Sequence, residues 1–275
     1  MSNPRLPAEM LDHIVDQLQD TTDALRNCCL VSKSWIPRTR KHLFADIELP
    51  TAESLQSWKK TFPDLSTSPA HYAKTLFVGF PEIVMSAEAG AWIRGFSRVV
   101  HLKMASNGPF VYSATASFVP FHGFSPIMKS LSVMLSALPF PQIFTLILSF
   151  PLLEDLALYG SYCPRNRSGD VFDGLPTVTQ SPGTPVFTGS LKLFLRGGMK
   201  PITHWLLSLP GGIHFRKLTW AWFLEEELSL TGALVEACSH TLESLTIVPY
   251  LSESILPLRP HKIAQYSSQV SRSPF

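Results

Sequence analysis

The first apolar positions of the chain recur at the spacing of an amphipathic helix. They are Met10, Leu11, Ile14, Val15 and Leu18, which fall on one helical face. Pro7 suits the first position of such a helix, because its missing N–H would have no partner there. Glu9 adds a favourable negative charge to the first turn. The pattern therefore predicts a helix that begins near Pro7.

Two more short helices are expected before residue 50. Thr22 and Asp23 are suited to cap the second helix, and Ser32 or Ser34 can begin the third. Pro37 is tolerated only if it lies in the first turn of that third helix. The expected apolar faces carry Ala24, Leu25 and Cys28 in the second helix and Trp35, Ile36 and Leu43 in the third.

A module of three helices in about forty residues has a small core and needs a neighbour or a partner. Leu6 and Pro7 precede the apolar stripe, so they are free to act as anchors. Trp35 is of a type that is frequent at interfaces. The pattern indicates a helical docking module, and the alternative is an N-terminal cap on the domain that follows.

From residue 74 onward, short apolar runs containing leucine recur. They are KTLFVGF (74–80), VVHLKMA (99–105), MKSLSVML (128–135), LLEDLALYG (152–160), GSLKLFLRG (189–197), FRKLTWAWF (215–223) and TLESLTIVPY (241–250). One reference leucine per run gives Leu76, Leu102, Leu131, Leu156, Leu193, Leu218 and Leu245. All but one of the spacings fall between 25 and 29 residues, and the exception is 37. This is the period of leucine-rich repeats.

Helical candidates lie between these runs, in QIFTLILSF (142–150), PITHWLLSLP (201–210) and the stretch from residue 229. Each repeat would then supply one strand and one helix, and stacked repeats share a continuous core. We expect an α/β fold: an irregular leucine-rich-repeat-like solenoid over 50–258, with parallel strands and with helices on the convex side. The alternative is an ordinary α/β domain with a parallel sheet.

Two interruptions of this pattern are rich in Gly, Pro and Ser. Residues 160–190 explain the long spacing and are predicted to be a loop insertion, either a substrate contact or a plain insertion. In the stretch 104–126, aromatic residues are expected to fill the convex side, the alternative being an exposed recognition patch: Phe110, Tyr112, Phe118, Phe121 and Phe124. Residues 259–275 are polar without periodicity and are predicted to be a disordered tail.

Composition narrows the class of protein. Apolar residues make up 45% of the 275 residues, which permits a sizeable core, and the formal net charge is only +2. The charge gives no reason to expect nucleic acid or a membrane as a partner. The apolar stretch 143–158 is interrupted by Pro151, Glu154 and Asp155, so it is not expected to span a bilayer. No signal peptide is visible, and we expect an intracellular protein of the cytoplasm or nucleus.

Motifs for catalysis or metal binding are missing from the sequence. The four cysteines and nine histidines show neither zinc spacing nor HExxH. No nucleophile elbow, phosphate-binding loop or dinucleotide fingerprint is present. The short basic run of Arg38, Arg40 and Lys41 is expected to be a solvated helix face. The sequence therefore predicts a non-enzyme without a cofactor or a metal.

Two blocks of the chain resemble an F-box. LPAEMLDHIVDQL (6–18) and LRNCCLVSKSW (25–35) follow the family pattern of Leu-Pro, a nearby acid, a mid-helix Ile and then Leu-Val-(Cys/Ser)-(Lys/Arg)-x-Trp. Ser32 stands where Cys is usual. The match covers about residues 5–49, and SWIPRTRKHLF (34–44) resembles F-box proteins of mushroom-forming fungi. The matching residues are Leu6, Pro7, Glu9, Ile14, Leu18, Leu25, Leu30, Val31, Ser32, Lys33 and Trp35.

The resemblance implies a substrate-recognition subunit of an SCF-type cullin-RING ubiquitin ligase. An F-box docks on the adaptor subunit and through it reaches the cullin and the RING protein. The following domain, similar to degenerate leucine-rich domains of fungal F-box proteins, would bind a protein substrate. Carried over by position, the adaptor-contact residues are Leu6, Pro7, Ile14, Leu30, Val31 and Trp35. Two alternatives remain: a scaffold whose helices only cap the solenoid, and an adaptor binder without a ligase role.

Overall fold

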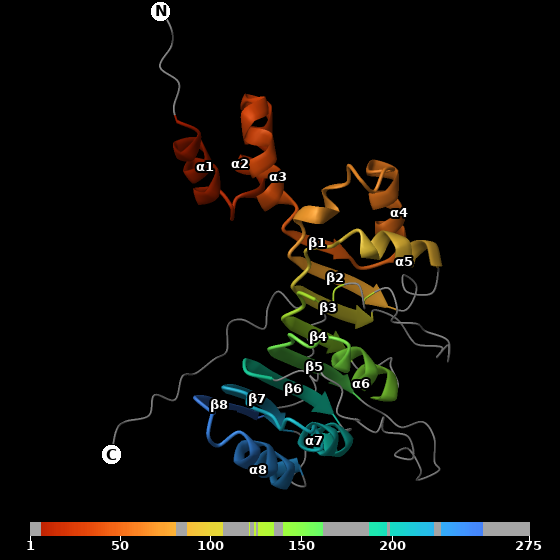
Figure 1. Cartoon of the computed structure of the whole chain (residues 1–275), viewed down its shortest axis with the longest axis vertical. Helices are drawn as coiled ribbons and strands as arrows, with labels where there is room; N and C mark the ends of the chain where they lie inside the picture. The colour runs from red at the N-terminus through yellow and green to blue at the C-terminus, as the bar shows by residue number, and fades with distance from the viewer. Residues whose placement is uncertain are drawn as a thin grey trace, which may run out of the picture.

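In the computed structural model, a small group of N-terminal helices is followed by one long sheet (Figure 1). It describes residues 7–80, 87–106, 121, 124, 126–134, 140–161, 187–196, 199–222 and 227–249. The N-terminal helices lie beyond one edge of the sheet, and the strands then follow one another in chain order to the opposite edge. The chain thus runs from a helical module into a stack of strand-and-helix units.

The N-terminal module contains the three helices that the sequence predicts. α1 spans Ala8–Gln17, α2 spans Thr22–Val31, and α3 spans Ile36–Leu43 after the short 3-10 helix η1 at Lys33–Trp35. The Ser32 hydroxyl caps η1 by accepting from the Ser34 N–H, and Pro37 lies in the first turn of α3. The buried apolar residues of the module are few: Val15, Leu25 and Cys28.

One parallel sheet of eight strands runs through the rest of the described structure. Its order follows the sequence from β1 to β8. The expectation of an α/β fold with parallel strands is confirmed, and each of the seven apolar runs contains a strand. The bounds are β1 Asp46–Leu49, β2 Thr75–Phe80, β3 His101–Ser106, β4 Ser130–Met134, β5 Asp155–Ser161, β6 Ser190–Arg196, β7 Lys217–Trp222 and β8 Ser244–Pro249.

Helices connect several of these strands and follow one another along the sheet (Figure 1). The three helical candidates of the sequence correspond to α6, α7 and α8. The bounds are α4 Ala52–Thr61, η2 Pro69–Tyr72, α5 Ala87–Arg94, α6 Phe140–Leu148, α7 Met199–Leu207 and α8 Glu227–Ala237. Phe144 on α6 and Trp205 on α7 lie in the core, where their rings stack with centroids 4.3 Å apart.

The core contains two rows of side chains, each with one residue from every strand. The first row is Ile47, Leu76, Leu102, Leu131, Leu156, Leu191, Leu218 and Leu245, and the second is Leu49, Val78, Met104, Val133, Leu158, Leu193, Trp220 and Ile247. Every member is buried except the two on β8. The rows make the core continuous from one strand to the next.

Two details of this register differ from the sequence reading. Leu191, not Leu193, is the partner of Leu156, so the reference leucine of the fifth run was misplaced by two residues. Alternate residues of a strand share one face, so both leucines fit the same buried pattern. The sheet also begins at Asp46, inside the range 5–49 expected for the helical module.

The start of each strand repeats one hydrogen-bond arrangement. Two successive N–H groups donate to a single carbonyl at the start of the preceding strand, as Lys74 and Thr75 do to Ala45. The same arrangement recurs at the starts of β3, β4, β5, β7 and β8. At β6 only the Gly189 N–H donates to the Glu154 carbonyl, and the Ser190 N–H donates to the Asp155 carboxylate instead. The units are thus equivalent, with one local substitution at β6.

The interruptions noted in the sequence are only partly described. Phe121 and Phe124 are buried, which confirms the core interpretation for these two aromatic residues. Phe110, Tyr112 and Phe118 lie outside the described residues, as do 162–186 of the insertion and the whole of 259–275.

Candidate functional site

The structure places the expected adaptor-contact residues around α1, the end of α2 and η1. Leu30 is 85% exposed, Val31 is 68% exposed and Ile14 is 39% exposed. Pro7 is exposed just before α1, and Trp35 in η1 is half-buried. Leu6 lies outside the described residues. The apolar stripe on α1 is therefore only partly buried.

Leu30 and Val31 have the largest exposed fractions among the large apolar side chains of the described module. They are the last two residues of α2, and the extended backbone of Ser32 follows them directly. Met10 on α1 is also exposed, at 53%. Exposed apolar side chains that adjoin one another, as Leu30 and Val31 do, mark an interaction surface more often than isolated ones do. We call Met10 and Ile14 on α1, Leu30 and Val31 on α2 and Trp35 in η1 the apolar ridge.

Trp35 is the last residue of η1, which lies next to both helices that carry the ridge. η1 packs against both α1 and α2, and α3 packs against both as well. The Ser32 hydroxyl, which accepts from the Ser34 N–H at 3.3 Å and lies 2.9 Å from the Ser34 hydroxyl, fixes the turn into η1. The residue that departs from the F-box pattern thus has a structural role here. It sets the position of Trp35 relative to Leu30 and Val31.

A polar cluster holds α1 against α3, and the sequence reading missed it. Arg38 donates through Nε to Asp16 Oδ1 at 2.6 Å and through Nη2 to Asp16 Oδ2. His42 Nε2 lies 2.7 Å from the same Oδ1. Arg38 and His42 are four residues apart on α3, so both face α1. That spacing was visible in the sequence, but the position of Asp16 opposite them was not.

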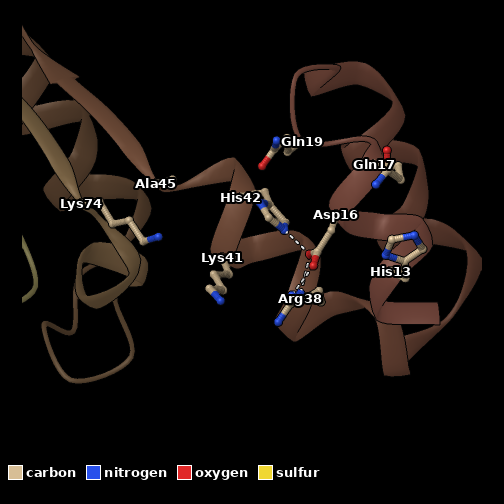
Figure 2. A pocket seen from close by; sticks show the side chains of 9 residues that line it. All are labelled: His13, Asp16, Gln17, Gln19, Arg38, Lys41, His42, Ala45 and Lys74. Carbon is tan, nitrogen blue, oxygen red and sulfur yellow. Dashed lines mark hydrogen bonds and ion pairs between the residues drawn. The ribbon is translucent and has the colours of Figure 1, made fainter. Parts of the chain in front are cut away.

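Figure 2 shows these three side chains among the residues that line an open cavity. The volume of this cavity is about 480 Å³. The Arg38 hydrogen bond, followed by that from His42, holds the pKa of the Asp16 carboxyl well below its usual range. Lys41 and Lys74 also line the cavity. Of the basic run expected to be solvated, Arg40 and Lys41 are exposed, whereas Arg38 is engaged with Asp16. The cluster is a structural clamp between α1 and α3.

Metal binding and membrane crossing can be judged for the described part of the chain. It contains no group of three His, Cys, Asp or Glu side chains placed to hold a metal ion. None of its helices combines the length and the apolar character needed to cross a membrane.

Comparison with protein-family models, with curated proteins and with solved structures returned no match to this chain.

Proposed function

We propose that the chain is an F-box protein, the substrate-recognition subunit of an SCF-type ubiquitin ligase. The N-terminal helices would bind the ligase adaptor, and the leucine-rich-repeat-like domain would hold a protein substrate. The observation that carries the proposal is the exposure of Leu30 and Val31 at the end of α2, at two positions of the F-box motif. Burying such side chains in a partner stabilises a complex by about 1.5–3 kcal/mol each.

The proposed mechanism is proximity rather than bond chemistry by this chain. A substrate held on the repeat domain would be close to the ubiquitin-charged enzyme that the cullin and the RING protein bring. Holding two reactants together replaces a slow bimolecular encounter. In this role the chain needs no cofactor, and it works inside the cell with the rest of the ligase.

The small core of the helical module supports a docking role. Val15, Leu25 and Cys28 are its buried apolar residues, and the Asp16–Arg38 pair supplements them. A module with so little burial gains stability from a partner. The clamp between α1 and α3 keeps Ile14 and Trp35 in a fixed relation before the partner arrives, which lowers the entropic cost of binding.

A second candidate is a scaffold in which the helices only cap the sheet. The contact that favours it is the packing of α3 against η2, which precedes β2. In this case α1 and the end of α2 would need no partner. The exposed ridge would then be without a function, which is why we favour the docking role.

Calorimetry of the full chain with the purified adaptor tests the proposal. We expect sub-micromolar binding, and a loss of at least tenfold, about 1.4 kcal/mol, in the Leu30→Ala/Val31→Ala variant. Leu6→Ala/Pro7→Ala and Trp35→Ala should weaken binding as well. Leu152→Ala is the matched control, since Leu152 is 52% exposed but lies just before β5, outside the helical module.

Two outcomes would change the conclusion. Absence of binding, with both proteins folded, would reject the docking role in favour of the scaffold. Adaptor binding without incorporation of the chain into a complex with cullin and RING protein on gel filtration would indicate an adaptor binder outside the ligase.

A further inference from the structure

One face of the sheet is directed away from the buried rows, and we call it the open face. Successive side chains of a strand point to opposite faces. On β3, Lys103 lies between the buried Leu102 and Met104, so it belongs to the open face. One register row of this face carries Lys103, Ser132, Ala157 and Lys192 from β3 to β6.

This row has a cation at each end and small side chains between. Lys103 and Lys192 are exposed, and neither forms an ion pair with another described residue. Ser132 and Ala157 are the small residues of the strip between them, and the Tyr159 hydroxyl reaches over this strip to hydrogen-bond with Ser132. A chain segment that lies along this strip reaches both lysines.

An aromatic pair borders the strip on the next row of the same face. The rings of Tyr159 on β5 and Phe194 on β6 are stacked, with centroids 5.3 Å apart and planes 12° apart. Both residues are half-buried, and Met134 precedes Tyr159 in the row. Burial raises the pKa of the Tyr159 hydroxyl, and a hydrogen bond with Ser132 opposes that rise. The pair is a fixed apolar platform beside the lysines.

On β3 to β7 the described part of the open face carries one carboxylate, Asp155, beside the three lysines Lys103, Lys192 and Lys217. Asp46 and Glu48 lie on β1, at the edge of the sheet nearest the helical module. Asp155 accepts two hydrogen bonds from Ser190. Lys217 is a third exposed cation of this face and lies on β7, the strand next to β6. The middle of the face is therefore positive, although the whole chain carries a formal net charge of only +2.

We propose that this part of the open face binds an extended acidic segment of a partner protein, with an aromatic or large aliphatic residue placed on Tyr159 and Phe194. The inference rests on the proposed function, because the segment belongs to the substrate. Charge complementarity selects acidic side chains, and the aromatic platform selects the apolar one. Lysines act as point charges without the bidentate geometry of arginine, which suits carboxylates of a flexible segment.

The spacing of the lysines sets the spacing of the acids. Lys103 and Lys192 are separated by three inter-strand steps, about 14 Å in all. An extended peptide covers that distance in about four residues. The expected segment therefore has acidic residues at positions i and i+4, with the apolar residue between them.

Selection from a random twelve-residue peptide library displayed on phage, against the immobilised full chain, tests the proposal. We expect enriched peptides with two Asp or Glu residues about four positions apart around an aromatic or aliphatic residue. In fluorescence polarisation, Lys103→Glu and Lys192→Glu should each weaken the enriched peptide at least tenfold, and Phe194→Ala should weaken it as well. Lys200→Glu is the matched control, since Lys200 is exposed on α7 rather than on the sheet.

Three results would overturn the proposal. The first is enrichment without an excess of acidic residues, or no enrichment by a folded chain. The second is an affinity that the two lysine variants leave unchanged. The third is a single-stranded oligonucleotide that binds more tightly than any peptide through the same lysines. Adaptor binding is measured separately through the helical module, so either proposal can fail while the other stands.

Discussion

Asp155 on β5 accepts two hydrogen bonds from Ser190 on β6, at 2.6 Å from the backbone N–H and at 2.7 Å from the hydroxyl. In the other units one carbonyl accepts two successive N–H groups, whereas at the start of β6 the Glu154 carbonyl accepts only the first and the Asp155 carboxylate accepts the second. The exception falls where the chain makes its longest excursion between strands. The side chain thus fixes the start of β6 after the insertion.

Asp155→Ala is expected to destabilise the fold by about 1–2 kcal/mol, because it leaves the Ser190 N–H and hydroxyl without their acceptor. Asp155→Asn keeps the Oδ1 acceptor and should lose less. Urea unfolding followed by circular dichroism measures both. Asp46→Ala is the matched control, since Asp46 occupies the same register row on β1 and is exposed. Equal losses in Asp46→Ala and Asp155→Ala would contradict the role of Asp155.

Asp16→Asn is expected to destabilise the protein by about 1 kcal/mol at pH 7, a small value because the pair with Arg38 is part-exposed. The folded-state pKa of Asp16 lies below its usual value. The stabilisation is therefore complete above the unfolded pKa of about 3.9 and is lost as the pH falls through the folded pKa.

Urea titrations of wild type and Asp16→Asn between pH 3 and pH 7 measure this dependence. The difference in the free energy of unfolding should be constant above about pH 5 and should shrink below about pH 4. Asp20→Asn, at an exposed aspartate just after α1, is the control and should show little difference at any pH. A difference that does not vary with pH would mean that the Asp16 charge contributes nothing.

Gly79→Ala should destabilise the sheet by about 1–3 kcal/mol through overpacking. A Cβ at Gly79 would lie 1.8 Å from the carbonyl oxygen of Pro50, which follows β1. The backbone of β1 or β2 must therefore shift. Gly211→Ala meets nothing within 4 Å and should change stability by less than about 0.5 kcal/mol. Thermal unfolding of the two variants compares them, and equal melting temperatures would contradict the close approach.

Two equivalent leucines of the first core row should contribute very different amounts to the free energy of unfolding. Leu218 on β7 is 3% exposed, whereas Leu245, its partner on the edge strand β8, is 43% exposed. Leu218→Ala should cost about 2–5 kcal/mol, and Leu245→Ala less than about 1 kcal/mol. Denaturant titration measures both. A large loss in Leu245→Ala would mean that something covers β8 in solution.

Local pattern alone determined most of the elements of this protein. The leucine spacing located seven of the eight strands, and the apolar positions before residue 50 located three helices. Ser32 caps η1, and Pro37, with its fixed φ, lies in the first turn of α3. Both effects act within a few residues of the chain. Leu30 and Val31 were named as candidate contacts by motif, and their exposure is compatible with that role.

Only the tertiary structure decided how these elements align. Leu191 and Leu193 lie on the same face of β6, so the alternation of a strand cannot distinguish them. The pairing of β6 with β5 places Leu191 opposite Leu156. β1 has four residues, too few to show a pattern by themselves. The carboxylate of Asp16 accepts a hydrogen bond from a residue 22 positions away, and that of Asp155 from a residue 35 positions away. Such contacts depend on chain segments that are distant in sequence, and no local periodicity encodes them.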